Sequence, residues 1–154
     1  MAFYFMDSSG LVKRYITKVG STWVQELTNP AAGNQICVVQ ITGVEVVAAI
    51  ARRQRQGSSS AEEAATVIAD FQADFSTAYY SLDVDAALVV VAMETAEKHG
   101  LRGYDAVQLA GALDLCSQCR IFGLPDPIVV SADVELNSAA AREGLAVDNP
   151  NSHA

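Results

Sequence analysis

The sequence predicts an α/β protein with a mainly parallel sheet that helices cover on both faces. Two observations support this fold class. Short apolar segments recur along the 154 residues, and helical apolar patterns separate them. Strands that alternate with helices in this way form parallel βαβ units. The expected strands are Phe3–Met6, Gln35–Val39, Tyr79–Leu82, Ile128–Ser131 and Leu145–Val147.

The first strand ends at an acidic residue. Phe3-Tyr-Phe-Met6 is apolar and runs into Asp7-Ser-Ser9, after which Leu11, Val12, Tyr15 and Ile16 follow a helical spacing. This pattern predicts a buried strand that stops at a helix cap. The carboxyl ends of strands in open α/β sheets are where ligands bind. Asp is also a preferred N-cap residue, so both roles are open for Asp7.

The next part of the chain predicts one short helix and two long ones. The short helix includes Trp23 and Leu27 and ends before Asn29-Pro30. Thr42 and Glu45 have capping-box spacing at the start of a helix that continues to Arg55. Three bases in its last turn complement the helix dipole, and contact with RNA is the alternative. Ser60 and Glu63 repeat the capping-box spacing before an apolar stripe that reaches Phe75.

The second half predicts three more helices. Asp83 is the expected cap of a helix with Gly100 at its end, where Lys98 and His99 complement the dipole. The next helix runs from the Leu101 segment to about Cys119, and the last ends at Gly144. We expect one domain over residues 1–147, followed by a polar tail over 148–154.

Composition limits the function classes. The hydrophobic fraction of 51% is typical of a globular protein. The net charge of −8 argues against a protein that binds long duplexes through their phosphates, because such proteins are usually basic. A local, cation-dependent phosphate site is compatible with this charge. No apolar run has transmembrane length, and no secretory signal is apparent. Cys37, Cys116 and Cys119 form no even framework, which favours a reduced, cytoplasmic protein. We interpret Cys116 and Cys119 as structural, because the pair ends a helical pattern instead of opening a helix as a redox motif does, and no second cysteine pair or nearby histidine completes a zinc site.

Four acids occupy unusual positions. Asp7 and Asp133 each follow a buried strand and precede a helix, while Asp105 lies in a first helical turn. Glu45 shares an apolar helical stripe, and carboxylates are rarely buried unless they are paired or bound to metal. Each acid has a structural explanation as a cap or, for Asp105, as a partner of Arg102. Together they would repel one another unless a cation lay between them. Oxygen ligands without His or Cys favour Mg²⁺ or Mn²⁺, which suits phosphoryl chemistry.

These motifs resemble the PIN-domain ribonucleases, and in particular the VapC-type toxins of prokaryotic toxin–antitoxin pairs. The likeness runs from Phe3 to about Val147. It rests on Asp7-Ser-Ser followed by Leu-Val-Lys-Arg-Tyr, on Thr-Gly-Val-Glu45, on Leu-Arg-Gly-Tyr-Asp105-Ala and on Val-Ser-Ala-Asp133-x-x-Leu. The resemblance implies a three-layer α/β/α sandwich and an Mg²⁺-dependent endoribonuclease. It also implies a homodimer and a small antitoxin partner.

Carried over to this chain, the resemblance assigns the acidic metal site to Asp7, Glu45, Asp105 and Asp133. Asp7, Asp105 and Asp133 would hold one Mg²⁺, with Mn²⁺ as the alternative ion. Glu45 would bind a second ion or orient the attacking water. Ser131 and Glu135 are both candidates for a further ligand.

Basic residues near the acids are candidates for phosphate contacts with an RNA substrate. They are Lys13, Arg14 and Arg102, and surface solvation is the alternative for the first two. A non-catalytic PIN-like binding module is the main competing function. A haloacid-dehalogenase-type phosphatase is disfavoured because Ser9 replaces the second Asp of its Asp-x-Asp motif, and a receiver domain because only Asp7 is acidic at the first strand. Gly10 is expected to loosen the first helix by roughly 1 kcal/mol relative to Ala.

Overall fold

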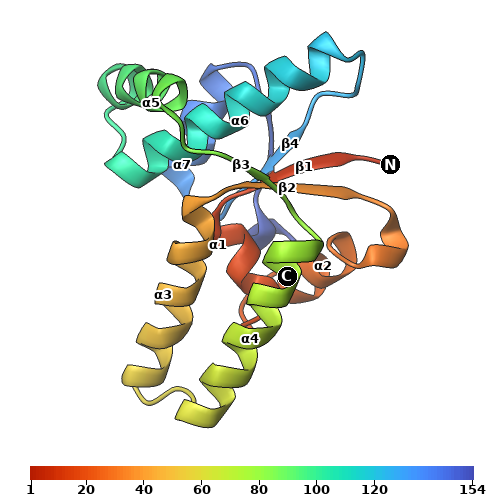
Figure 1. Ribbon diagram of the computed structural model, residues 1–154, viewed down its shortest axis with the longest axis vertical. Coiled ribbons are helices and arrows are strands. Elements are labelled where there is room, and N and C mark those ends of the chain that lie inside the picture. Colours follow the sequence, from red (N-terminus) through yellow and green to blue (C-terminus); the bar gives the residue numbers. More distant parts are fainter.

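The structure, a computed structural model, describes residues 1–154 as one five-stranded sheet with helices on both faces (Figure 1). The strands lie in the order β3-β2-β1-β4-β5, and every pair is parallel. Their bounds are β1 Phe3–Met6, β2 Gln35–Val39, β3 Tyr80–Leu82, β4 Ile128–Val130 and β5 Ala146–Asp148. The α/β prediction with a parallel sheet is therefore confirmed, and the three-layer sandwich with it.

Seven α-helices and three 3₁₀ turns connect the strands. The helices are α1 Ser8–Leu11, α2 Ser21–Leu27, α3 Ile41–Arg55, α4 Ala61–Thr77, α5 Ala86–His99, α6 Gly103–Ile121 and α7 Val134–Arg142. The 3₁₀ turns are η1 Val12–Arg14, η2 Pro30–Ala32 and η3 Pro150–Ser152. None of these helices is long and apolar enough to cross a membrane.

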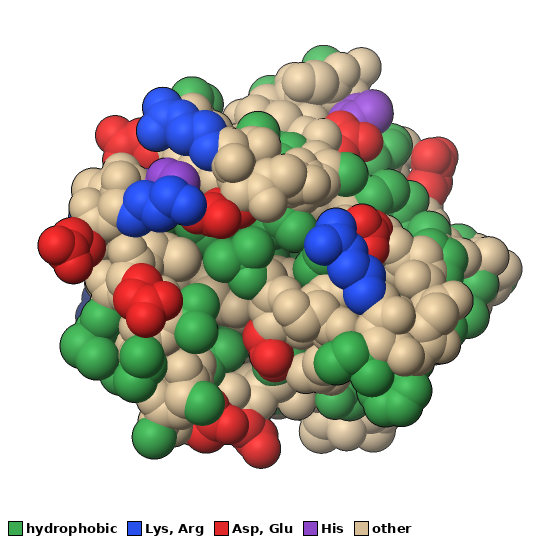
Figure 2. All heavy atoms as spheres, turned by 90° about the horizontal axis from the view of Figure 1, so that it is seen from above, with side chains coloured by type: hydrophobic (Ala, Val, Ile, Leu, Met, Phe, Trp, Pro, Cys, Tyr) green, Lys and Arg blue, Asp and Glu red, His purple; other side chains and the backbone are tan.

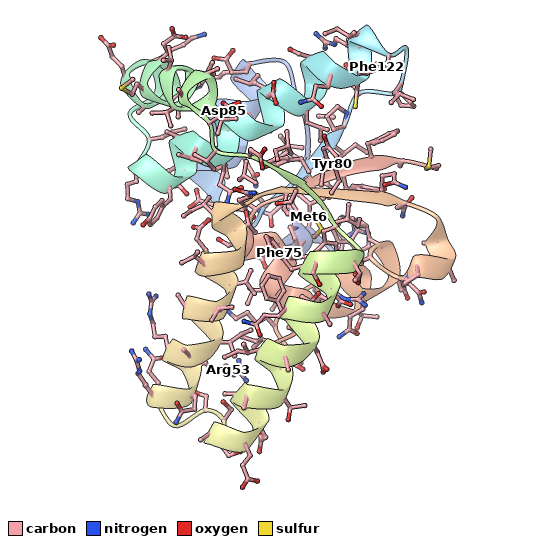
Figure 3. The ribbon with its side chains drawn as sticks, in the orientation of Figure 1. Met6, Arg53, Phe75, Tyr80, Asp85 and Phe122 are labelled. Atoms are coloured by element: carbon pink, nitrogen blue, oxygen red, sulfur yellow. The ribbon has the colours of Figure 1, made fainter.

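Two hydrophobic cores lie on opposite faces of the sheet. Phe5 belongs to the core beneath α5, α6 and α7, while its neighbour Met6 belongs to the core beneath α1 to α4. This alternation follows from the period of two along a strand, and both faces are apolar because helices cover both. Figure 3 shows Phe75 of α4 directed toward α3, where its ring fits against Gly43. The α3–α4 pair projects from the body of the molecule (Figure 1).

Two predicted helix caps are wrong. Helix α3 begins at Ile41 after Gln40, so Thr42 lies inside it and is fully buried rather than capping it. Helix α5 is capped by Asp85, whose Oδ1 accepts from the Leu88 N–H. Asp83 instead accepts a hydrogen bond from the Gln40 side chain. At α5, Asp83 and Asp85 both have cap chemistry and Asp85 makes the cap. At α3 no side chain caps the helix, and the Thr42 hydroxyl accepts from Gln108 instead.

Gly10 lets the first helix lie close to the sheet. A Cβ at this position would lie 2.6 Å from the Val130 carbonyl oxygen of β4. No real Cβ contact is that short, so any larger residue would push α1 away from the strand. The propensity cost of Gly10 stays a prediction, and the close approach of α1 to β4 gives a packing reason for a glycine at this position.

Residues 148–154, predicted as a polar tail, pack against the body of the protein. Asp148 belongs to β5 and pairs with Val130. Asn151 accepts a hydrogen bond of 2.8 Å from the Lys13 ammonium, and the His153 ring stacks on Trp23 at 4.0 Å. The C-terminal segment thus holds α2 and the first helical turns in place.

Candidate functional site

The carboxyl edge of the sheet gathers the four predicted acids from four different elements. Strand β1 lies between β2 and β4, so the chain direction of the crossovers reverses there and leaves a crevice at this edge. Asp7 ends β1 and Asp133 follows β4. Glu45 lies in α3, the helix after β2, and Asp105 lies in the first turn of α6. The topology thus brings together residues that are far apart in the sequence.

Asp7 is the most buried of these acids. Its residue is 3% exposed, and its carboxylate accepts hydrogen bonds from the Gly10 N–H at 2.8 Å and from the Ser9 and Ser131 hydroxyls. Burial raises the pKa of Asp7 to about 6, against the lowering effect of these donors, and Glu45 adds a smaller repulsion. The cap role predicted for Asp7 is present, since its side chain caps α1.

The other three acids line a pocket of about 680 Å³ in front of Asp7. Its lining residues are Ser8, Glu45, Arg52, Arg102, Gly103, Tyr104, Asp105 and Asp133. Burial and repulsion from Asp133 raise the pKa of Asp105, while Arg102, 3.8 Å away, opposes this rise. Asp133 caps α7 through its Oδ1, which accepts from the Leu136 N–H. The pocket therefore concentrates negative charge, although two arginines line it.

Glu45 is held by a residue that the sequence did not indicate. Gln108 of α6 is 2% exposed, and its Nε2 donates to Glu45 Oε1 at 2.7 Å and to Thr42 Oγ1 at 2.8 Å. Burial raises the pKa of Glu45, and the Gln108 hydrogen bond opposes that rise. The capping-box explanation of Glu45 is wrong, because it lies in the second turn of α3. One signal was available, namely a polar Gln108 one turn after Asp105 within an apolar stretch.

The candidates for a further ligand differ in position. Ser131 is fully buried and donates to Asp7 Oδ2 at 2.8 Å, so it contacts a site acid directly. Glu135 is exposed in the first turn of α7 and acts on Asp105 only through charge. Ser9, which was not singled out from the sequence, bonds to Asp7 and to the Ala132 N–H. The structure thus favours Ser131 over Glu135 as a neighbour of Asp7.

The candidate phosphate-binding residues separate into two groups. Arg102 lines the acidic pocket, and so does Arg52 from the arginine cluster of α3. Lys13 is buried and its ammonium binds the Val19 carbonyl and Asn151, so it does not face the site. Arg14 donates to Thr28 and pairs with Asp74 at 3.5 Å. Lys13 and Arg14 are therefore structural in this fold.

The donors around the pocket are of the kind that a hard divalent cation prefers. They are carboxylates and hydroxyls without His or Cys, and their mutual repulsion would be relieved by a cation. However, no group of three or more His, Cys, Asp and Glu side chains is close enough together to hold an ion in this structure. The chemistry of the donor set fits such an ion, whereas the spacing is wider than one coordination shell.

The surface around α5 to α7 has few basic side chains that could bind nucleic acid. In the view over this side, Lys and Arg side chains are few and interspersed with acids and apolar side chains (Figure 2). Exposed apolar residues there include Val90 and Met93 of α5. A long basic stripe of the kind that tracks a duplex is not present on this face.

Comparison with solved structures gives the fold a name. PAE2754 from Pyrobaculum aerophilum is similar over 98% of this chain and 85% of its own, with a TM-score of 0.64 and 16% identity. VapBC2 from Rickettsia felis, bound to a DNA fragment from its promoter, covers 96% of this chain and 98% of its own, with a TM-score of 0.62 and 15% identity. Both neighbours are PIN-domain proteins.

The chain has a PIN-like fold. The third neighbour, FitAcB from Neisseria gonorrhoeae, covers 96% of this chain and 97% of its own, with a TM-score of 0.57 and 15% identity. No protein-family model and no curated protein matches the sequence. At these identities the PIN-like likeness concerns the backbone, so the functional argument depends on the residues of the site itself.

Proposed function

We propose that the protein is a divalent-cation-dependent endoribonuclease that uses Mg²⁺, with Mn²⁺ as the alternative ion. The observation that carries this proposal is the convergence of Asp7, Glu45, Asp105 and Asp133 on one crevice of a PIN-like sheet. Three of these acids line one pocket, and the fourth lies buried behind it. Such an accumulation of like charge is costly without a cation, which supports a metal site.

In this proposal Asp7, Asp105 and Asp133 would hold one cation, and their side chains would have to move closer together to do so, because no three acids are close enough in this structure. When bound, the cation supplies charge stabilisation on the phosphate and the leaving oxygen. Glu45 would bind a second ion or orient the attacking water. The Ser9 and Ser131 hydroxyls keep the Asp7 carboxylate in one orientation. No histidine is required, which is consistent with His99 and His153 being paired to carboxylates elsewhere.

The rim of the pocket suits a phosphodiester substrate. Arg52 and Arg102 line it and would contact phosphates of the substrate. Tyr104, also at the rim, is 61% exposed and offers a flat surface on which a base stacks. These three residues make a small local contact area, which accords with a net charge of −8. An RNA substrate is therefore proposed to bind at the pocket only.

We further propose that the chain is the toxin of a toxin–antitoxin pair, working as a homodimer in the cytoplasm. The structural neighbours VapBC2 and FitAcB are toxin–antitoxin proteins, which supports a small antitoxin as the partner. The three free, buried cysteines support a reducing compartment. Co-expression with the product of an adjacent small gene, followed by co-purification, tests the antitoxin. Sedimentation of the purified chain tests the homodimer.

The nuclease proposal is tested by incubating the purified protein with a labelled RNA pool. We expect cleavage with Mg²⁺ or Mn²⁺ and none with EDTA. Asp105→Asn should abolish the metal-dependent activity, and Glu45→Gln should reduce it strongly to a level that is still measurable. Asp114→Asn is the matched control, because Asp114 is exposed on the same helix as Asp105 and bonds only to Gln118. Full activity of Asp105→Asn would refute the site. Absence of cleavage by the wild type with either metal would instead support a non-catalytic PIN-like binding module.

A further inference from the structure

The contact between Gln108 and Glu45 joins the two helices that carry neighbouring site acids. Glu45 lies on α3, and Asp105 lies one turn before Gln108 on α6. Both hydrogens of the Gln108 amide are used, one for Glu45 Oε1 at 2.7 Å and one for Thr42 Oγ1 at 2.8 Å. Thr42 is fully buried, so the amide is anchored at the wall of the core and reaches outward to the carboxylate.

This arrangement leaves a polar atom of Gln108 without a partner. The Gln108 Oε1 atom is buried and accepts no hydrogen bond. Around it, the buried face of α6 is otherwise made of small and apolar residues such as Ala106, Leu109 and Ala112. A residue needed only for packing would be apolar here, because an unpaired buried carbonyl destabilises the fold. The amide is therefore explained better by what it holds than by what it packs against.

We propose that Gln108, anchored by Thr42, is a positioning residue that fixes the Glu45 carboxylate at a set distance from Asp105. The inference rests on the proposed nuclease function, since it assigns a role within that site. Gln108 lies behind Glu45 and does not line the pocket, so it acts through Glu45 and contacts no substrate. Without the amide, Glu45 swings among its rotamers and is correctly placed for a smaller fraction of the time.

The first test replaces the amide with an apolar side chain of similar length. Gln108→Met should lower kcat on the RNA substrate by about 10- to 100-fold, the range found when a group that orients a metal ligand is removed. KM should stay within about 2-fold, because the rim residues are untouched. Gln118→Met is the matched control, since Gln118 is a half-buried glutamine on the same helix that bonds only to Asp114 and does not contact Glu45. An unchanged kcat in Gln108→Met would overturn the inference.

A double-mutant cycle separates positioning from a general structural role. If Gln108 acts only through Glu45, then Gln108→Met should have less than about 2-fold further effect on kcat in the Glu45→Gln background. A structural defect would lower kcat by the same factor in both backgrounds, and that result would contradict the inference. Gln108→His, which keeps one donor, should recover part of the lost activity.

A measurement without RNA keeps the inference separate from the proposed function. Mn²⁺ affinity is measured by calorimetry for the wild type, Gln108→Met and Gln118→Met. We expect a loss of about 10- to 100-fold in Gln108→Met alone. If the wild type cleaves no RNA, the nuclease proposal fails, and this Mn²⁺ comparison still decides the role of Gln108. Equal Mn²⁺ affinities in all three proteins would overturn the proposed positioning role of Gln108.

Discussion

Replacement of Asp7 by Asn should make the protein more stable and inactive. Asp7 is buried, and its pKa is raised from 3.8 to about 6, chiefly by burial. At about 1.36 kcal/mol per pKa unit, this rise corresponds to about 3 kcal/mol that opposes folding once the group is ionised. An Asn retains an oxygen to accept from the Gly10 N–H and carries no charge. About 3 kcal/mol is therefore the upper limit of the increase in the free energy of unfolding that Asp7→Asn can produce.

The effect of Asp7 on stability has a defined direction with pH. Because the pKa is higher in the folded state, the folded protein binds more protons than the unfolded chain between pH 3.8 and about 6. The contribution of Asp7 to stability is thus complete below pH 3.8 and is lost as the pH rises through about 6. Asp7→Asn and the wild type should have equal stability at the acid end of this window. The variant should be more stable at pH 8.

Urea unfolding in EDTA at a series of pH values from 3.5 to 8 measures this difference. In a thermal melt of a chain of this length, a difference of about 3 kcal/mol would raise the Tm by roughly 6–12 °C. Asp114→Asn makes the same chemical change at an exposed position of α6 and should show no pH-dependent gain. If Asp7→Asn were equally or less stable than the wild type at pH 8, the account of Asp7 as a strained buried carboxylate would be wrong.

Three further predictions concern packing, substrate binding and the C-terminus. Gly10→Ala should lower the free energy of unfolding by about 1–3 kcal/mol in urea titrations, because its Cβ would meet the Val130 carbonyl at 2.6 Å. Arg52→Ala should weaken RNA binding and lower the slope of log K against log salt by about 0.7, whereas Arg55→Ala, outside the pocket, should leave the slope unchanged. Removal of residues 150–154 should lower Tm, measured by circular dichroism, because the Lys13 ammonium loses a side-chain partner and Trp23 its stacked ring.

Much of the fold was predictable because its signals are local. The apolar runs of β1 and β2 have the predicted bounds, and Ser60 caps α4 by bonding to the Glu63 N–H as the spacing indicates. Such patterns depend on contacts within about four residues, so neighbouring side chains are sufficient to specify them. The misplaced caps at Thr42 and Asp83 mark where a hydrogen bond to a residue far away in sequence, Gln108 or Gln40 respectively, took the place of the local cap.

The positions of the site residues along the strands and helices were also predictable, but their environments were not. The sequence alone determined that Asp7 and Asp133 follow strands and that Glu45 and Asp105 lie in helices. Only the tertiary structure decided how these acids differ. It buried Asp7 beneath Ser131, which is 124 residues away in sequence.

Contacts between distant segments also set the surroundings of Glu45 and of the basic residues. In the folded protein Glu45 accepts a hydrogen bond from Gln108, which is 63 residues away in sequence. It also turned Lys13 away from the pocket while bringing Arg52 to its rim. The physical reason is that burial and charge environment depend on the order of the strands and on which helices meet, and short-range periodicity does not encode either.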